Sequence, residues 1–328
     1  MFINLIQQRF FPWLITLLLS FCSAVAIPSN TKASIIKPSS YTDIQAFFTA
    51  EDYHWDNLHQ GVPDIRLHCF PADLNNIEDI QEKKHLFYMS LLPMVLAQNN
   101  AIQQQRLTLK QILQQFDRSG SITLQQQTWL KELGQQYHCD VAPLSSTKVR
   151  GRLLNRVNVV PAALVIAQAA NESAYGTSRF ARIANNIFGE WTFKVGTGIV
   201  PLQRSTGQKY EVKKFATLND SLISYFNNIN THRAYKKLRD VRQQMSAAGK
   251  PIDAQKLAEG LINYSTRRDA YVAEIQAMIR YNRLCQLSTL ELRSQQVQIA
   301  EQPSRKNIAG SILRISELSS RVRAKRII

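Results

Sequence analysis

The segment VVPAALVIAQAANES, residues 159–173, constrains the fold more than any other part of the chain. Pro161 suits the first turn of a helix, and the residues after it are apolar on every side, so we predict a helix from Pro161 to Asn171. A helix without a polar face has to be covered on all sides by other elements. The segment therefore predicts a domain with this helix in its middle, and Gly176 ends it.

Glu172 is the first charged residue after this apolar run. Apolar burial and the negative end of the helix dipole both disfavour its charged form, and no basic residue lies within five positions to offset them. We therefore expect a raised pKa. A glutamate that keeps its proton near neutral pH can protonate the leaving oxygen of a glycosidic bond. The alternative is an exposed residue at the end of a helix, without a catalytic role.

Helical periodicity continues on both sides of this segment. Residues 82–106, 107–116 and 124–137 predict a helical N-terminal region, with Pro93 as a potential kink. Residues 189–215 are rich in β-formers and predict a β-hairpin that turns near residues 205–208, and helices resume at Asp220 and again at Ala270. The pattern predicts a mainly α fold with a small β-hairpin lobe.

The N-terminus has the features of an export signal. Residues 14–26, LITLLLSFCSAVA, follow Arg9 and end in the small-x-small pattern of a cleavage site. We interpret residues 1–26 as a signal peptide that places the protein in the periplasm or otherwise outside the cytoplasm. An uncleaved segment that anchors the chain in the membrane is the alternative. Residues 27–60 are polar and mixed and predict a linker.

The formal net charge is +16, and removal of residues 1–26 takes away only Arg9. This charge suits nucleic acid, anionic lipid or an acidic cell wall, and export argues against nucleic acid. Cys69, Cys139 and Cys285 are too few for a disulfide framework, so one pair with a free thiol or three thiols remain open. The adjacent pairs His68-Cys69 and His138-Cys139 lack the wider spacing of metal sites. We expect no metal and no cofactor.

Several ordered motifs resemble a known enzyme family. Residues 167–189, AQAANESAYGTSRFARIANNIFG, are similar to the signature of the bacterial N-acetylglucosaminidases of glycoside hydrolase family 73, and to its Bax-type group in particular. Further counterparts are LLPMVLAQNNAI (91–102), NINTHRAYKKLR (228–239) and NYSTRRDAYVAEIQAMI (263–279). The resemblance covers roughly residues 60–285.

The resemblance implies a lysozyme-like, mainly α fold and cleavage of the β-1,4 bond after N-acetylglucosamine in peptidoglycan glycan strands. It makes Glu172 the general acid, places Tyr264 at the catalytic centre, and gives Tyr175 and Phe188 to substrate binding. Core packing is the alternative for Phe188. Gln168, one turn before Glu172, and Tyr225 are further candidates for substrate binding. With Glu211, a candidate for a second catalytic carboxylate, the candidate site comprises Glu172, Tyr264, Glu211, Tyr175, Phe188, Gln168 and Tyr225.

The resemblance divides the chain into a helical N-terminal region at 61–145, a glucosaminidase catalytic domain at 146–285 and a polar, basic tail at 286–328. The sequence departs from the family in the turn NIFGEWTF, where Glu190 and Trp191 stand, and at Asn263, where the family has glycine. We expect these differences to affect substrate selection.

Glycoside hydrolysis usually needs a second carboxylate. Glu211, on the predicted hairpin, is the first candidate and Glu190 the second, while Asp220 is better explained as a helix cap. Assistance by the acetamido group of the substrate is the third route. Two other functions stay open: a lytic transglycosylase or muramidase, and a catalytically silent protein that binds the wall.

Overall fold

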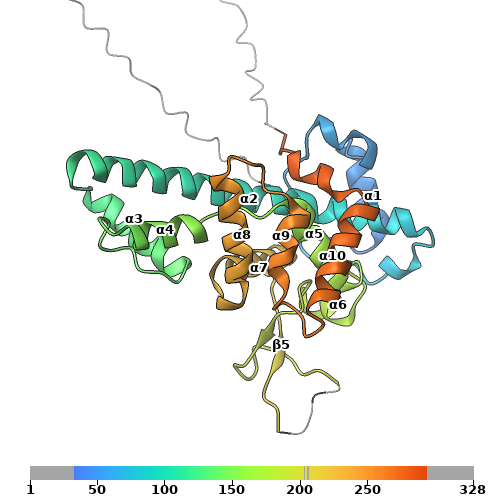
Figure 1. Ribbon diagram of the computed structural model, residues 1–328. Coiled ribbons are helices and arrows are strands. Elements are labelled where there is room, and N and C mark those ends of the chain that lie inside the picture. The colour runs from blue at the N-terminus through green and yellow to red at the C-terminus, as the bar shows by residue number, and fades with distance from the viewer. Residues whose placement is uncertain (1–32, 203, 205–206, 294–328) are drawn as a thin grey trace, which may run out of the picture. The chain divides into compact units, whose positions relative to one another are not determined.

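The computed structural model describes residues 33–202, 204 and 207–293 (Figure 1). Helices dominate these residues, so the expected mainly α fold with a small β-lobe is confirmed. The longer helices are α1 Tyr41–Ala50, α2 Ile80–Ser119, α3 Leu124–Gln136, α4 Thr147–Arg156, α5 Ala162–Ser173, α6 Arg179–Ala184, α7 Leu218–Thr231, α8 Lys236–Ala247, α9 Ala254–Ala258 and α10 Asp269–Tyr281. The single-turn helices are η1 Trp55–Gln60, η2 Leu74–Asn76, η3 Arg233–Tyr235, η4 Glu259–Leu261 and η5 Leu284–Thr289.

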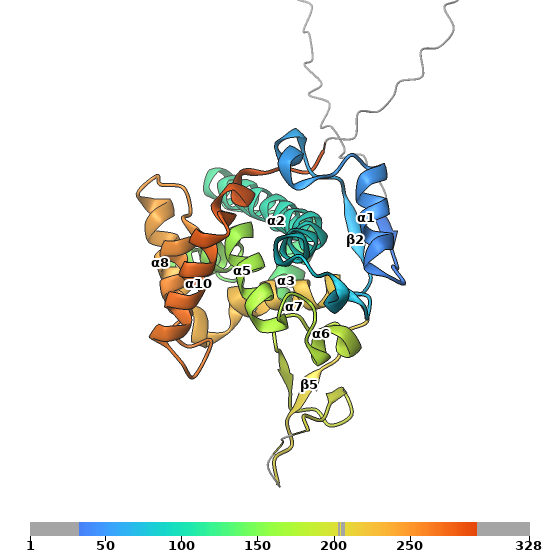
Figure 2. The same ribbon diagram turned by 90° about the vertical axis from the view of Figure 1, so that its right-hand side faces the viewer.

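Helix α5 is the apolar helix that the sequence predicted. Every side chain from Ala162 to Ala170 is buried, and α2, α10 and η5 pack around it. Figure 2 shows α5 between α2 on one side and α10 on the other. The helix ends at Ala174, which has a left-handed backbone at φ +48°, so the chain turns two residues earlier than Gly176. Glu172 thus lies in the last turn of a fully covered helix.

Helix α2 is one continuous helix of 40 residues, whereas the sequence predicted separate segments. Pro93 lies inside it, and the mostly polar stretch 98–105 continues the helix with Ile102 buried and most of the other side chains toward solvent. The first half of α2 belongs to the main core, and the second half packs with α3 and α4 around a smaller core. The N-terminal helical region therefore shares its core with the part of the chain that follows residue 145.

The expected linker at 27–60 is wrong for the residues that the structure describes. Ser40 caps α1 by accepting a hydrogen bond from the backbone of Asp43, and Ile44 and Phe48 of this helix are buried in the main core. Strand β1, Ser34–Ile36, pairs in parallel with β2, Ile65–Leu67. Because only two side chains of α1 are buried, its apolar periodicity is too short to stand out in the sequence.

The start of the expected tail is likewise ordered against the N-terminal part. Leu287 of η5 is fully buried, and Leu292 forms an isolated bridge with Val62. Arg293 donates hydrogen bonds to the carbonyl oxygens of Glu51, Asp52 and Gly61. Residues 286–293 are therefore part of the fold, and the rest of the predicted tail lies outside the described residues.

The β-lobe contains three short strands instead of a simple hairpin. These are β3 Trp191–Thr192, β4 Gly198–Ile199 and β5 Glu211–Lys213, in the antiparallel order β3-β5-β4. Figure 1 shows this lobe projecting from the helices near α6 and α7. Thr217 caps α7, and Asp220 completes the capping box from the third position of the helix instead of acting as the cap itself.

The three cysteines of the described part, Cys69, Cys139 and Cys285, carry free thiols. Among the residues that the structure describes, no helix is both long and apolar enough to span a membrane. The predicted signal peptide lies outside those residues.

Candidate active site

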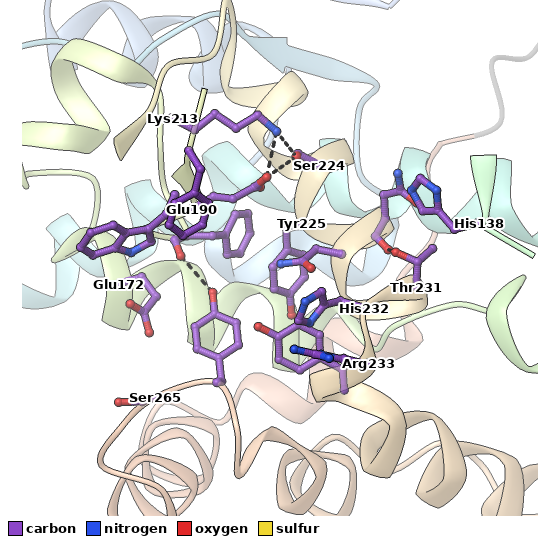
Figure 3. Close-up of a pocket in the computed structure, with 18 of the residues that line it drawn as sticks. His138, Glu172, Glu190, Lys213, Ser224, Tyr225, Thr231, His232, Arg233 and Ser265 are labelled. Carbon is purple, nitrogen blue, oxygen red and sulfur yellow. Dashed lines mark hydrogen bonds and ion pairs between the residues drawn. The ribbon is translucent and has the colours of Figure 1, made fainter. Parts of the chain in front are cut away.

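A cavity of about 920 Å³ opens between the end of α5, the β-lobe and α7. Figure 3 shows the polar side chains that face it. Of the predicted site residues, four line this cavity: Glu172, Phe188, Tyr225 and Tyr264. The second candidate carboxylate, Glu190, lines it as well. The other lining residues are His138, Arg156, Gly189, Trp191, Phe193, Lys213, Ser224, Asn227, Asn228, Thr231, His232, Arg233, Tyr235 and Ser265.

Glu172 is half-buried at the floor of the cavity. Burial raises the pKa of its carboxyl group, and the nearby carboxylate of Glu274 adds to the effect. Hydrogen bonding with Tyr271 and the charge of Arg267 act in the opposite direction, but desolvation is the largest cause. The pKa of Glu172 is therefore raised, as its place after the apolar helix predicts. A raised pKa favours the protonated acid that glycosidic cleavage needs.

The turn at residues 185–189 lies against this acid. Asn186 is buried, and its side chain holds the turn by bonding to the backbone of Glu190 and to the carbonyl oxygen of Lys213. Gly189 has φ +66°, and a β-carbon at this position would lie 3.6 Å from Oε2 of Glu172. The turn therefore brings a backbone without a side chain up to the carboxyl group.

Aromatic side chains form the wall next to Glu172. Tyr264 donates a hydrogen bond of 2.9 Å from its hydroxyl to the carbonyl oxygen of Phe188, and the ring of Phe188 stacks on Tyr225 at 3.9 Å between centroids. Tyr271 stacks on Tyr264 at 5.3 Å. Burial raises the pKa of Tyr225 and Tyr264 well above the usual value, so both hydroxyls keep their protons.

Gln168 does not reach the cavity and is not a substrate contact. Its side chain is fully buried, donates a 3.0 Å hydrogen bond to the hydroxyl of Tyr271 and accepts one of 2.6 Å from the hydroxyl of Tyr225. The amide therefore fixes two tyrosines that face Glu172. Gln168 lies one turn before Glu172 on α5, so its side chain points to the same face of the helix and contacts these tyrosines within the core.

Tyr175 also lies away from the cavity. Its backbone is left-handed at φ +56°, which turns the side chain out of the line of α5. The ring packs edge-on to Phe87, lies 6.0 Å from the ring of Tyr88, and carries the ammonium group of Lys84 over its face. The structure thus gives Tyr175 a packing position, and the motif alone did not reveal the direction of its side chain.

Glu211 is buried in the β-lobe and is not among the residues that line the cavity. Its carboxylate accepts hydrogen bonds from the backbone N–H groups of Gly196 and Gly198, at 2.8 to 3.1 Å. The backbone of Gly196 is the main cause of its lowered pKa. Glu211 therefore holds the loop between β3 and β4, and the structure removes it as the second carboxylate.

Glu190, the second candidate, lines the cavity. Oε1 of Glu190 accepts hydrogen bonds of 2.8 Å from both Nζ of Lys213 and Oγ of Ser224. Oε2 has no hydrogen-bond partner among the described residues. The sequence ranked Glu190 below Glu211 because sequence position does not show which side chain of a β-lobe faces inward. The departure from the family pattern at NIFGEW was the available signal.

Trp191 and Phe193 extend the aromatic wall onto the β-lobe. They are 49% and 78% exposed, although both are large apolar side chains. Trp191 is steadied by Tyr210, whose ring lies 4.2 Å away. Exposed aromatic faces at the rim of a polar cavity suit the apolar faces of sugar rings. In the sequence, Trp191 differs from the family pattern, but that difference alone does not indicate a place at the rim of the cavity.

The far end of the cavity is basic. It contains Arg156 at the end of α4, His138 after α3, His232 after α7 and Arg233 at the start of η3. This end could not be predicted from the sequence, because its residues come from segments that are distant along the chain. Within the described ranges, no group of three or more His, Cys, Asp or Glu side chains is placed to bind a metal ion.

Residues 152–284 match the model of the family described as mannosyl-glycoprotein endo-beta-N-acetylglucosaminidase. The chain is 29% identical over 210 residues to Protein bax of Escherichia coli strain K12, and the alignment covers 64% of this chain and 73% of that protein. It also matches the catalytic domain of the autolysin Auto from Listeria monocytogenes, with 16% identity and a TM-score of 0.27, over 51% of this chain and 89% of that one.

Proposed function

We propose, on the premise that residues 152–284 form a glycoside hydrolase domain of the glucosaminidase family, that this protein is an exported peptidoglycan hydrolase. Its reaction is hydrolysis of the β-1,4 bond after N-acetylglucosamine in glycan strands, with Glu172 as the general acid. The observation that carries the proposal is the environment of Glu172: a half-buried carboxyl group with a raised pKa, at the floor of an open cavity.

In this reaction Glu172 donates its proton to the glycosidic oxygen while the bond from that oxygen to C1 breaks. The neighbouring tyrosine hydroxyls keep their own protons, so Glu172 is the acid of suitable strength on this wall. Tyr264, which is tied to the carbonyl oxygen of Phe188, fixes the turn that covers the acid. We assign Tyr264 a positioning role on this basis.

Glu190 is the group that activates water in our proposal. Lys213 and Ser224 anchor Oε1, which leaves Oε2 to accept a proton from a water molecule in the cavity. The water oxygen bonds to C1, its proton passes to Oε2, and Glu172 is left ionised. Proton exchange with solvent then restores both groups. A base that activates water on the face opposite the acid predicts inversion at C1.

The rim aromatics support a glycan as the substrate. Trp191 and Phe193 offer exposed ring faces on the β-lobe, beside the cavity that contains both carboxyl groups. A cavity of about 920 Å³ is at the upper end of the range for ligand pockets, and it is open to solvent along the rim. Such a site accommodates more than one sugar of a strand.

The test is digestion of purified peptidoglycan by the chain without residues 1–26, with products identified by mass and by anomeric configuration. We expect products with N-acetylglucosamine at the new reducing end, and a loss of about a hundredfold or more in Glu172→Gln and Glu190→Gln. Glu132→Gln, an exposed acid on α3, is the matched control and keeps full activity. Equal activity in Glu172→Gln would contradict the acid assignment.

The products also separate the other candidate functions. An anhydro-muramyl end would identify a lytic transglycosylase, and N-acetylmuramic acid at the reducing end would identify a muramidase. Retention at C1 would point to the acetamido group instead of Glu190. Binding to peptidoglycan without turnover in any variant would identify a wall-binding protein.

Export is tested separately, on the full chain. We expect a tagged chain to be recovered outside the cytoplasm with a new N-terminus after Ala26, which mass spectrometry of the intact protein measures. A full-length mass in the membrane fraction would support the anchored alternative.

A further inference from the structure

The cavity has two chemically different ends. Both acidic residues of its lining, Glu172 and Glu190, lie at one end, where Lys213 pairs with Glu190, and the other basic residues of the lining lie toward the opposite end. Figure 3 shows His232 and Arg233 beyond Tyr225, with Thr231 and His138 farther from Glu172. The acidic end fits the reaction that we propose, and the basic end is not used by it.

Two guanidinium groups at the basic end have free donors. Arg233 is exposed, and its side chain makes no ion pair and no hydrogen bond with the residues that the structure describes. Arg156 donates from Nη1 to the carbonyl oxygens of Tyr137 and His138, while its other two nitrogens have no partner in the described part of the chain. Arg156 is therefore held in place, with part of its fork available.

An uncharged polar wall lies beside these cations. Asn227, Asn228 and Thr231 of α7 line the same end of the cavity. Amide and hydroxyl side chains can donate to and accept from the backbone groups of a peptide. Cations pair with its carboxylates. The basic end is therefore complementary to a peptide, which carries both kinds of group.

We propose that this basic end binds the stem peptides of peptidoglycan through their carboxylates, with Arg233 and Arg156 as the anion contacts. The inference rests on the proposed function, since the sugars that occupy the acidic end would bring their attached peptides to this one. In a strand with peptides, the lactyl carboxyl group of each muramic acid is taken up in the amide bond to the peptide, so the peptide carboxylates are the anions that such a strand offers. Amidase treatment removes them and leaves one carboxylate close to each muramic acid ring. Binding of this kind makes strands with peptides better substrates than bare glycan.

The site joins two parts of the fold. His138 follows α3 of the N-terminal helical region, whereas Arg156 on α4 and Arg233 belong to the domain at 146–285. The carbonyl oxygens of Tyr137 and His138 accept the hydrogen bonds that hold Arg156. The N-terminal helical region therefore positions one of the two cations of the specificity site.

The experiment measures binding with the Glu172→Gln chain, so that turnover is not needed. Its ligands are glycan strands that carry stem peptides and the same strands stripped of peptides by an amidase. We expect the intact strands to bind about tenfold more tightly at low salt, and Arg233→Ala to remove that preference. Lys237→Ala, an exposed cation near Arg233 but outside the cavity lining, keeps it.

Equal affinity for intact and stripped strands would overturn the proposal, as would an equal loss on both ligands in Arg233→Ala. Free stem peptide and inorganic phosphate are then compared as competitors. Competition by the peptide supports carboxylate recognition, whereas competition by phosphate alone would show a general anion site and contradict it. If peptide selectivity holds but the wild-type chain cleaves nothing, the proposed function fails and this inference stands.

Discussion

Oε2 of Glu172 lies 3.6 Å from the point where a β-carbon on Gly189 would stand. Gly189 also has φ +66°, a conformation that costs other residues energy. A methyl group at residue 189 would therefore lie in van der Waals contact with the acid, on a backbone whose left-handed conformation favours glycine. The turn after α6 thus lies close to an acid that is 17 residues earlier in the chain.

We predict that Gly189→Ala lowers hydrolysis tenfold or more, because the added methyl group occupies space beside Oε2 of Glu172 that the substrate needs, and the left-handed backbone costs about 1 kcal/mol. Gly249→Ala is the matched control: Gly249 has the same φ of +66° but nothing within 4 Å of its β-carbon position. Both variants should lose similar stability in thermal melts. Equal activity in the two would show that the contact with Glu172 has no catalytic effect.

Tyr271→Phe should move the alkaline limb of the pH–rate profile to higher pH. Hydrogen bonding with Tyr271 favours the charged form of Glu172 and lowers its pKa, so its removal raises that pKa further. The acid then keeps its proton to higher pH. The measurement is kcat/KM against pH on soluble glycan fragments, with the melting temperature recorded beside it. A limb that moves to lower pH would contradict the assignment of Glu172 as the acid.

Glu172→Gln should stabilise the protein at neutral pH by about 1 kcal/mol, within the range of single substitutions. The pKa of Glu172 is higher in the folded than in the unfolded state, so the folded state binds more protons above pH 4.5 and loses stability as pH rises. Glutamine removes that loss. Urea unfolding at pH 4 and pH 8 measures it, and the gain should be larger at pH 8. A larger gain at pH 4 would mean that the pKa is lowered.

The apolar helix and its acid could be predicted from the sequence because both depend on neighbouring residues. A run without a polar face requires burial, and the last turn of a buried helix places Glu172 where water is scarce. The small β-lobe also followed from local composition. The second carboxylate could not be predicted from the sequence, since Glu190 and Glu211 lie on the same lobe. They differ in their surroundings: Glu211 is bound by backbone N–H groups, whereas Glu190 faces the cavity.

The other differences have the same origin. Tyr175 faces away from the cavity because three left-handed residues in succession turn the chain after Ser173, and the identities of these residues do not specify that direction. Residues 33–60 and 286–293 appeared as linker and tail because their order comes from contacts with distant segments: β1 pairs with β2, and Arg293 donates to the carbonyl oxygen of Glu51. Contacts between segments that are far apart in the chain leave no periodic signal.

We predict that Arg293→Ala destabilises the fold by about 1 to 2 kcal/mol. Its guanidinium donates to three backbone carbonyl oxygens near the N-terminal end of the described chain, and hydrogen bonds from charged donors are stronger than neutral ones. Arg280 on α10 donates a single side-chain hydrogen bond, to Gln255, so Arg280→Ala should lower the free energy of unfolding much less. Chemical denaturation measures both. Equal losses would show that the two chain ends are held by other contacts.

Gly260→Ala and Gly151→Ala should change stability in opposite directions. A β-carbon on Gly260 would lie 2.1 Å from Cα of Leu238, so η4 and α8 have to separate and we expect a loss of about 3 kcal/mol. Gly151 lies within α4, and nothing is within 4 Å of its β-carbon position, so alanine should stabilise the helix by up to about 1 kcal/mol. Urea unfolding measures both changes, and a stable Gly260→Ala protein would contradict the close approach of η4 to α8.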